Sequence, residues 1–154
     1  MESSRNWPSS VLASLPPGAA LCVGFSGGLD SAVLLDILAR RAGHRLAALH
    51  VHHGLSPNAN LWAAFCEGFC AERDVPLAIE RVDVARDSGE GLEAAARGAR
   101  YAAYARRAEP FVALAHHLDD QAETVLLQLL RGTGLKGVAA MPQMRRLAGS
   151  VVTL

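Results

Sequence analysis

The amino-acid sequence predicts an α/β fold: a doubly wound, mostly parallel sheet of about five strands with helices on both faces. Two observations lead to this fold class. Short apolar runs alternate with longer segments of helical periodicity along the chain. The apolar runs are also unbroken, which is typical of strands that are buried on both faces of a parallel sheet.

The first half of the chain contains the pattern strand, helix, strand, helix, strand. Strands are expected over residues 20–25, 46–51 and 76–82, and a helix over 31–42, where apolar residues lie almost all round the axis. A second helix is indicated by apolar side chains at i, i+3, i+4, i+7 and i+8, namely Trp62, Phe65, Cys66, Phe69 and Cys70. We expect this apolar face, with both cysteines, to belong to the core.

The second half of the chain continues the alternation. An alanine-rich helix is expected over 91–108, with Pro110 close behind its end. A strand is expected over 111–115 and a helix over 119–130. A fifth strand is expected to begin within 149–153. Helices that follow strands in this way are typical of crossover connections between parallel strands.

Length and composition limit the class of protein. The 154 residues carry 15 basic and 15 acidic side chains, a balance that excludes a generally basic nucleic-acid binder. We expect an amino-terminal extension over residues 1–16 and one domain over 17–154. Three cysteines do not suit a secreted disulfide framework, and no apolar run approaches the length of about 20 residues that spans a membrane. The sequence therefore predicts a cytoplasmic protein with no membrane partner.

The loop after the first strand carries the strongest functional signal. It consists of Ser26, Gly27, Gly28, Leu29, Asp30 and Ser31. Two glycines let the backbone turn tightly beside an anion, and the next helix presents its N–H groups and positive dipole end there. The loop therefore predicts phosphate binding, without the lysine of a Walker loop. The alternative is an ordinary glycine-rich turn in which Asp30 and Ser31 cap the helix.

Further stretches sharpen this signal into a family resemblance. The loop 26–31 resembles the SGGxDS signature of the PP-loop ATP pyrophosphatases, whose sheet is Rossmann-like, of the adenine nucleotide alpha hydrolase type. Residues 50–55, 93–101 and 116–134 follow in the order and spacing of the tRNA(Ile)-lysidine synthetases within that superfamily. The resemblance covers about residues 18–142. It implies a catalytic domain, truncated before carboxyl-terminal tRNA-binding domains.

The resemblance implies a two-step reaction that uses ATP, Mg²⁺ and free L-lysine. ATP adenylates the C2 carbonyl of the wobble cytidine in an isoleucine tRNA with a CAU anticodon, and pyrophosphate leaves. The ε-amine of lysine then displaces AMP, which gives lysidine. A homodimer is left open. The alternatives are another PP-loop tRNA-modifying enzyme that performs 2-thiolation, and an ATP-binding module without catalysis.

The resemblance also implies roles for individual residues. ATP would bind to the six loop residues together with His50, His52 and Arg100. Catalytic roles would fall to Asp30, Arg97, His116, Asp120 and Glu123, and Asp30 and Asp120 would hold magnesium.

These roles have structural alternatives. Spacing of i, i+4 and i+7 places His116, Asp120 and Glu123 on one helix face, but an acid such as Asp120 can simply favour the helix dipole. Without the resemblance, Arg97 and Arg100 would be interpreted as a surface pair. Strand alternation predicts His50 and His52 on one side of the sheet and His53 on the other. For this histidine stretch we favour contact with a nucleotide over zinc binding.

Overall fold

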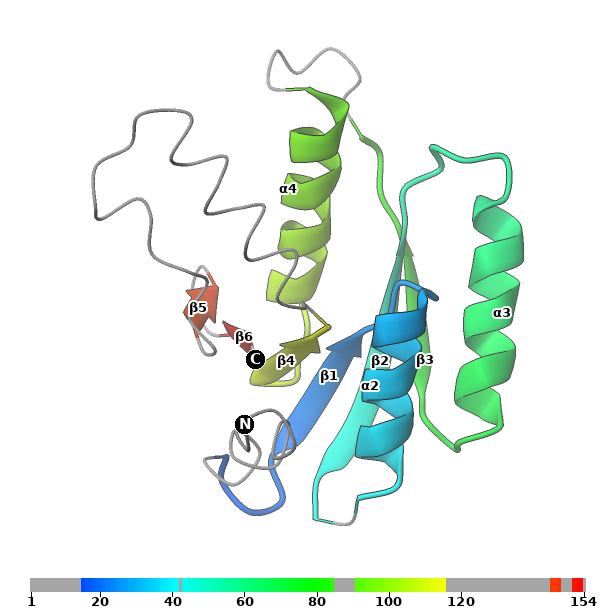
Figure 1. Cartoon of the computed structure of the whole chain (residues 1–154). Coiled ribbons are helices and arrows are strands. Elements are labelled where there is room, and N and C mark those ends of the chain that lie inside the picture. Colours follow the sequence, from blue (N-terminus) through cyan, green and yellow to red (C-terminus); the bar gives the residue numbers. More distant parts are fainter. Residues whose placement is uncertain (1–14, 42, 85–90, 116–144, 148–150, 154) are drawn as a thin grey trace, which may run out of the picture.

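The structure, a computed structural model, describes residues 15–41, 43–84, 91–115, 145–147 and 151–153. Within these residues a six-stranded sheet has the strand order β3-β2-β1-β4-β6-β5 (Figure 1). The strands are β1 (Ala20–Gly24), β2 (Arg45–His52), β3 (Leu77–Arg81), β4 (Phe111–Leu114), β5 (Arg145–Leu147) and β6 (Val151–Thr153). The helices are α2 (Leu29–Ala39), α3 (Ala59–Ala71) and α4 (Leu92–Ala105).

The pairing of the strands confirms a mostly parallel, doubly wound sheet. Strand β1 pairs in parallel with β2 and β4, β2 with β3, and β4 with β6. Strand β5 pairs antiparallel with β6 at the edge of the sheet. The expected fifth strand is confirmed as β6, whereas β5 was not expected, because three residues are too few to show a pattern in the sequence.

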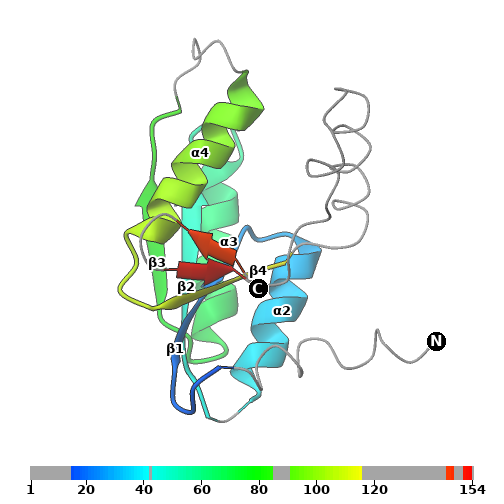
Figure 2. The same cartoon turned by 90° about the vertical axis from the view of Figure 1, so that its left-hand side faces the viewer.

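Helices cover both faces of the sheet, as Figures 1 and 2 show, with α2 and α3 on one face and α4 on the other. The alternation of β1 explains this arrangement. Leu21 and Val23 pack in the cluster that includes residues of α2 and α3. Cys22, between them, packs with Ala103 and Tyr104 of α4. Both faces of the central strand are therefore buried, as its unbroken apolar run predicts.

The buried face of α3 differs from the expected one. Cys66 and Cys70 are buried, as expected, but their companions in the core are Ala59 and Ala63. Trp62 is 52% exposed and Phe65 49% exposed, so the prediction that these two rings lie in the core was wrong. Small side chains at i, i+4, i+7 and i+11 let the helix lie close to the sheet, and the bulky rings stay at the border of the contact.

Two sequence expectations fall outside the described residues: the helix over 119–130, and nearly all of the extension over 1–16. In the part of the chain that the structure describes, none of the helices has both the length and the apolar character to cross a bilayer.

The topology places a ligand site at one edge of the sheet. From β1 the chain adds β2 and then β3 on one side, and it returns to the other side of β1 for β4. The strand order thus reverses at β1. In sheets of this kind ligands bind beyond the carboxyl ends of the strands at such a reversal. The loops that follow β1 and β2 are therefore the first places to search for a site.

Candidate functional site

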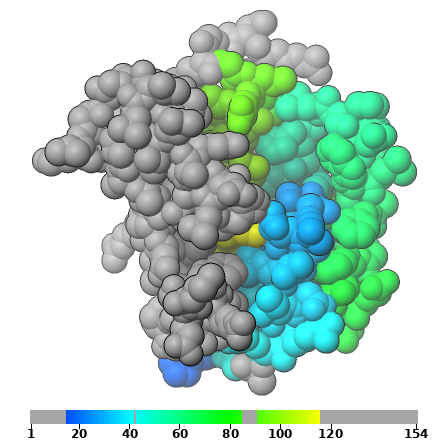
Figure 3. Space-filling view, viewed as in Figure 1, coloured from blue at the N-terminus to red at the C-terminus, as the bar shows by residue number. Residues whose placement is uncertain are grey.

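The loop after β1 contains a glycine that its backbone requires. Gly27 has φ of +85°, a conformation that side chains with a Cβ rarely adopt. A Cβ at this position would also lie 3.1 Å from Cys66 Sγ and 3.7 Å from Phe65 Cδ1. The loop therefore lies directly against α3, and Figure 3 shows the start of α2 in blue beside that green helix.

A closed ring of hydrogen bonds shapes the same loop. The Gly28 N–H donates to Ser26 Oγ at 3.2 Å, and Ser31 Oγ donates to the Gly28 carbonyl at 3.0 Å. The two hydroxyl oxygens are 3.0 Å apart. Because the Ser31 proton goes to the carbonyl, Ser26 donates to Ser31. Both serines thus hold the loop in shape before any ligand binds.

Helix α2 begins in this loop without a side-chain cap. Its N-cap is Gly28, with extended backbone, and no side chain caps the N–H groups of the first turn. Asp30 and Ser31 lie within the first turn instead, so the alternative in which they cap the helix was wrong. The positive end of the helix dipole, with first-turn N–H groups that lack a side-chain cap, faces the loop. This is the arrangement that binds phosphate at helix N-termini.

A cavity of about 300 Å³ lies next to the loop, at the carboxyl ends of β1 and β2. It is lined by Phe25, Ser26, His50, Val51, His52, His53, Gly54, Leu55, Ser56, Ala59, Trp62, Arg100 and Tyr104. Mixed apolar and polar linings of this kind are typical of small-molecule sites.

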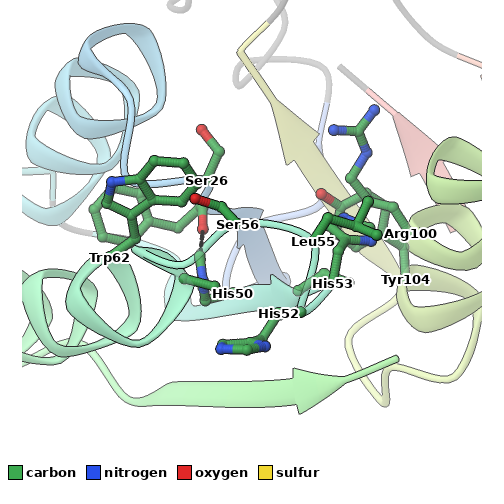
Figure 4. Close-up of a pocket in the computed structure, with 13 residues that line it drawn as sticks. Ser26, His50, His52, His53, Leu55, Ser56, Trp62, Arg100 and Tyr104 are labelled. Carbon is green, nitrogen blue, oxygen red and sulfur yellow. Dashed lines mark hydrogen bonds between the residues drawn. The ribbon is translucent and has the colours of Figure 1, made fainter. Parts of the chain in front are cut away.

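The cavity extends from one face of the sheet to the other. Figure 4 shows Ser26, Ser56 and Trp62 at one end, on the side of α3. Arg100 and Tyr104 of α4 lie at the other end. The cavity therefore connects the loop 26–31, on one face of the sheet, with the Arg100 guanidinium on the other.

Two of the histidines at the end of β2 are held by protein partners. The buried His50 ring donates from Nδ1 to the Phe25 carbonyl at 2.9 Å. His52 donates from Nε2 to Asn60 Oδ1 at 3.0 Å, which leaves Nδ1 to accept from Arg81 Nη1 at 3.4 Å. Both rings face α3 and line the cavity, so the predicted alternation is confirmed for this pair. Their contact with a nucleotide stays a prediction.

The third histidine lies on the side of α4. Burial, and then the charge of Arg100, lower the pKa of His53, which favours a neutral imidazole. Its Nδ1 is buried and has no hydrogen-bond partner within the described residues. His53 also borders a second cavity of about 300 Å³, between the ends of β2 and β3.

The two arginines of α4 lie in different surroundings. Arg100 lines the cavity, as expected of a nucleotide-binding residue. Arg97 is exposed, and its guanidinium lies 5.7 Å from the centre of the Tyr101 ring, a cation–π distance. It is not among the residues that line the cavity. The catalytic role expected for Arg97 stays a prediction, because its side chain does not line the cavity.

The cysteines are not suited to covalent chemistry in this conformation. All three are buried and free. Burial raises the pKa of Cys22 and Cys66 to about 12 and that of Cys70 to about 11. A thiol with such a pKa stays protonated at neutral pH and is a poor nucleophile.

The expected magnesium ligands and acid–base groups are only partly described. Asp30 is exposed in the first turn of α2, beside the loop. His116, Asp120 and Glu123 lie outside the described residues. Within the described residues, no group of three or more His, Cys, Asp or Glu could hold a metal ion.

Several residues of the cavity were missed from the sequence. His53, Ser56 and Tyr104 were given no site role, and Trp62 was assigned to the core. Only His53 had a signal, because it belongs to the same short histidine stretch as His50 and His52. The other three come from α3, α4 and a loop, and only the folded chain brings them together.

A hydrogen-bonded glycine loop at the carboxyl edge of a parallel sheet, next to an open cavity, is typical of nucleotide-binding α/β domains. The chain belongs to the PP-loop domain family, whose model matches residues 8–153. It is 56% identical to the tRNA(Ile)-lysidine synthase of Chromobacterium violaceum over 148 residues. This matched region makes up 94% of this chain and 33% of that protein. The chain is 54% identical over 147 residues to the enzyme of the same name from Xanthomonas axonopodis pv. citri, covering 92% and 33%.

The chain thus spans about a third of the length of these curated relatives. Among solved structures it is similar to the U34-tRNA thiolase NcsA from Methanococcus maripaludis, with a TM-score of 0.59. The two share 22% sequence identity, over 80% of this chain and 47% of that one. This likeness supports the PP-loop fold alone. The sequence relatives favour the lysidine synthase family over a thiolase.

Proposed function

We propose that this chain is the ATP-dependent catalytic domain of a tRNA(Ile)-lysidine synthase. One observation carries the proposal: the ring of hydrogen bonds through Ser26, Gly28 and Ser31 shapes an anion site that opens into a cavity reaching Arg100. An ATP molecule needs an anion site for its phosphates and an adjoining cavity for its nucleoside, and the loop and the cavity offer these two parts. The identity of 52–56% to curated enzymes of this name supports the choice of reaction.

In the proposed first step, the C2 carbonyl oxygen of the wobble cytidine attacks the α-phosphorus of ATP. The new bond joins oxygen to phosphorus, and the bond from the α-phosphorus to pyrophosphate breaks. Negative charge grows on the departing pyrophosphate. The first-turn amides of α2, in a loop whose shape Ser26 and Ser31 hold, stabilise that charge, because donors fixed in advance need no reorganisation. We assign Arg100, at the other end of the cavity, to binding phosphate of ATP or of the tRNA.

In the proposed second step, the ε-amine of lysine attacks C2 of the adenylated base. The C2–O bond breaks, AMP leaves, and the amine loses a proton. A lysine ammonium has an ordinary pKa of about 10.4, so a base must remove its proton at neutral pH. We assign this role to the acids Asp120 and Glu123, with His116 beside them, and charge stabilisation to Arg97. The substrate is a tRNA, and we therefore place the reaction in the cytoplasm.

Magnesium fits the phosphate loop. An acid in the first turn of α2, next to a site for pyrophosphate, would repel the anion unless a cation lay between them. Asp30 offers carboxylate oxygen, the ligand that Mg²⁺ prefers, and we propose that Asp30 and Asp120 hold the ion. The bound ion would neutralise phosphate charge.

The test is transfer of labelled lysine to RNA. The chain is incubated with ATP, magnesium, radiolabelled lysine and an isoleucine tRNA with a CAU anticodon. The proposal expects label in the tRNA, dependent on ATP. The matched control is the same tRNA with uridine at the wobble position, which has no 4-amino group and is expected to stay unlabelled. Because the relatives are about three times as long as this chain, a longer protein that contains it is tested beside it. Absence of label from the CAU tRNA with both proteins, with ATP bound, would contradict the proposed reaction.

A further inference from the structure

Trp62 has an unusual position for a tryptophan. It lies in the first turn of α3, and 52% of its surface is exposed. Its side chain lines the end of the cavity that holds Ser26 and Ser56. A large aromatic side chain left half in water loses much of the stabilisation that burial provides. A bound ligand that covered the ring would recover it.

The neighbouring aromatic rings pack against one another, and Trp62 is not part of their cluster. Phe25, Phe65 and Phe69 form a cluster in which ring centres lie 5.3 to 6.4 Å apart. Trp62 has no ring contact of this kind with the described residues. Ring packing with the described residues therefore does not account for its position. The ring borders instead on the cavity next to the loop 26–31.

We infer that Trp62 is the platform on which the nucleobase of the bound nucleotide stacks. The inference rests on the proposed function, since the base is taken to be the adenine of ATP. The backbone of Trp62 is a near neighbour of Gly27: a Cβ on that glycine would lie 4.0 Å from the Trp62 carbonyl oxygen. A nucleotide whose phosphates bind at the loop thus has its base within reach of the indole when it bends back over the cavity.

The chemistry of the surroundings suits a base. An indole offers a flat π-surface, and stacking on it is tolerant of the base but demands a planar ring. Polar groups for the base edge and ribose lie around it, namely the Ser56 hydroxyl and the backbone of the loop after β2. Stacking of a base on an aromatic ring changes binding by about fivefold or more on removal of the ring.

The experiment compares ATP with tripolyphosphate, which has the phosphates but no base. Affinities of both, with magnesium, are measured by calorimetry for the wild-type chain and for Trp62→Ala, Trp62→Phe and Leu61→Ala. Leu61 is the matched control: it is 69% exposed on the same helix and does not line the cavity. Trp62→Ala is expected to weaken ATP binding about fivefold or more and to leave tripolyphosphate binding unchanged. Trp62→Phe should restore most of the loss, and Leu61→Ala should bind ATP like the wild type.

Fluorescence gives a second measurement. The chain has two tryptophans, so in a Trp7→Phe background the emission comes from Trp62 alone. ATP is expected to quench this emission, and tripolyphosphate is not. Equal ATP affinity in wild type and Trp62→Ala would overturn the inference. So would an equal loss for ATP and tripolyphosphate, or quenching by an RNA hairpin with a CAU loop but not by ATP.

These outcomes are separate from those of the proposed function. If Trp62 controls ATP affinity but labelled lysine never enters tRNA, the inference stands and the proposed reaction falls. If lysine is transferred while Trp62→Ala binds ATP like the wild type, the reaction stands and the inference falls.

Discussion

The imidazole of His50 donates a hydrogen bond from Nδ1 to the carbonyl oxygen of Phe25, at 2.9 Å. The N–H of Phe25 donates in turn to the Leu49 carbonyl, at 2.9 Å. Phe25 is thus held to β2 through both its N–H and its carbonyl, the first bonded to backbone and the second to a side chain. The chain leaves β1 at this residue and enters the phosphate loop. His50 therefore sets the point from which the loop starts.

Replacement of His50 by leucine should reduce both stability and ATP affinity. It leaves the buried Phe25 carbonyl without its donor, at a cost of about 1–3 kcal/mol in the free energy of unfolding. Asparagine carries its amide nitrogen near the position of Nδ1, and His50→Asn should recover part of the loss. Urea unfolding and calorimetry with ATP check both variants. A leucine variant as stable as the wild type would show that the hydrogen bond contributes nothing.

Gly28→Val should abolish nucleotide binding while the fold survives. Gly28 is extended, and a Cβ there would contact only Ser26 Oγ, at 3.4 Å, so the backbone tolerates a side chain. The valine methyl groups, however, would occupy space above the loop where phosphates must approach. Gly27 is a poorer choice for this test, because its positive φ makes any substitution strained. Calorimetry with ATP is the measurement, and unchanged affinity in Gly28→Val would refute the assignment of the loop.

Much of the fold was predictable from the sequence, because buried parallel strands leave unbroken apolar runs. The bounds of β1, β2, β3 and β4 agree with the expected strands to within one residue at each end. The start of α2 was placed two residues late, since Gly28, and not a side chain, provides its N-cap.

The site was predictable only where its residues are contiguous in the sequence. The loop 26–31 carries its own signal, and so does the stretch 50–53. The exposure of Trp62 depends on which face of α3 meets the sheet, and that depends on how small Ala59 and Ala63 are compared with the rings beside them. Both Ala59 and Ala63, and Trp62 and Phe65, fit a helical spacing with Cys66 and Cys70, so periodicity alone does not tell which set faces the sheet.

Asp120→Asn should bind ATP but lose most adenylation. The asparagine keeps the size of the side chain and removes the charge that we assign to magnesium and to the lysine amine. ATP affinity from calorimetry should change little, whereas pyrophosphate release in the presence of tRNA should fall by about tenfold or more. A variant with full pyrophosphate release would return Asp120 to a purely structural role.

Stability should decline at alkaline pH. Burial raises the pKa of Cys22 and Cys66 from 9.0 to about 12, and that of Tyr104 from 10.0 to about 12. Above pH 9 the unfolded chain therefore loses protons that the folded chain keeps, and the free energy of unfolding falls as pH rises. This stabilisation is fully present below pH 9 and is lost between 9 and about 12.

Urea unfolding at about pH 8 and about pH 10.5 measures this decline. The matched variant Cys22→Ala removes one of the buried thiols, and its stability should fall less steeply over the same range. Equal slopes for wild type and variant would mean that Cys22 ionises alike in the folded and unfolded chain.

The central claim is that the loop and cavity direct cleavage of ATP between its α- and β-phosphates onto a cytidine of tRNA. The most direct measurement follows ATP labelled at the α-phosphate in one reaction and at the γ-phosphate in a parallel one, with lysine and the CAU-anticodon isoleucine tRNA present. The account predicts that AMP and pyrophosphate form in equal amounts, and only when this tRNA is added. Formation of ADP and inorganic phosphate, or of AMP at the same rate without the tRNA, would contradict it.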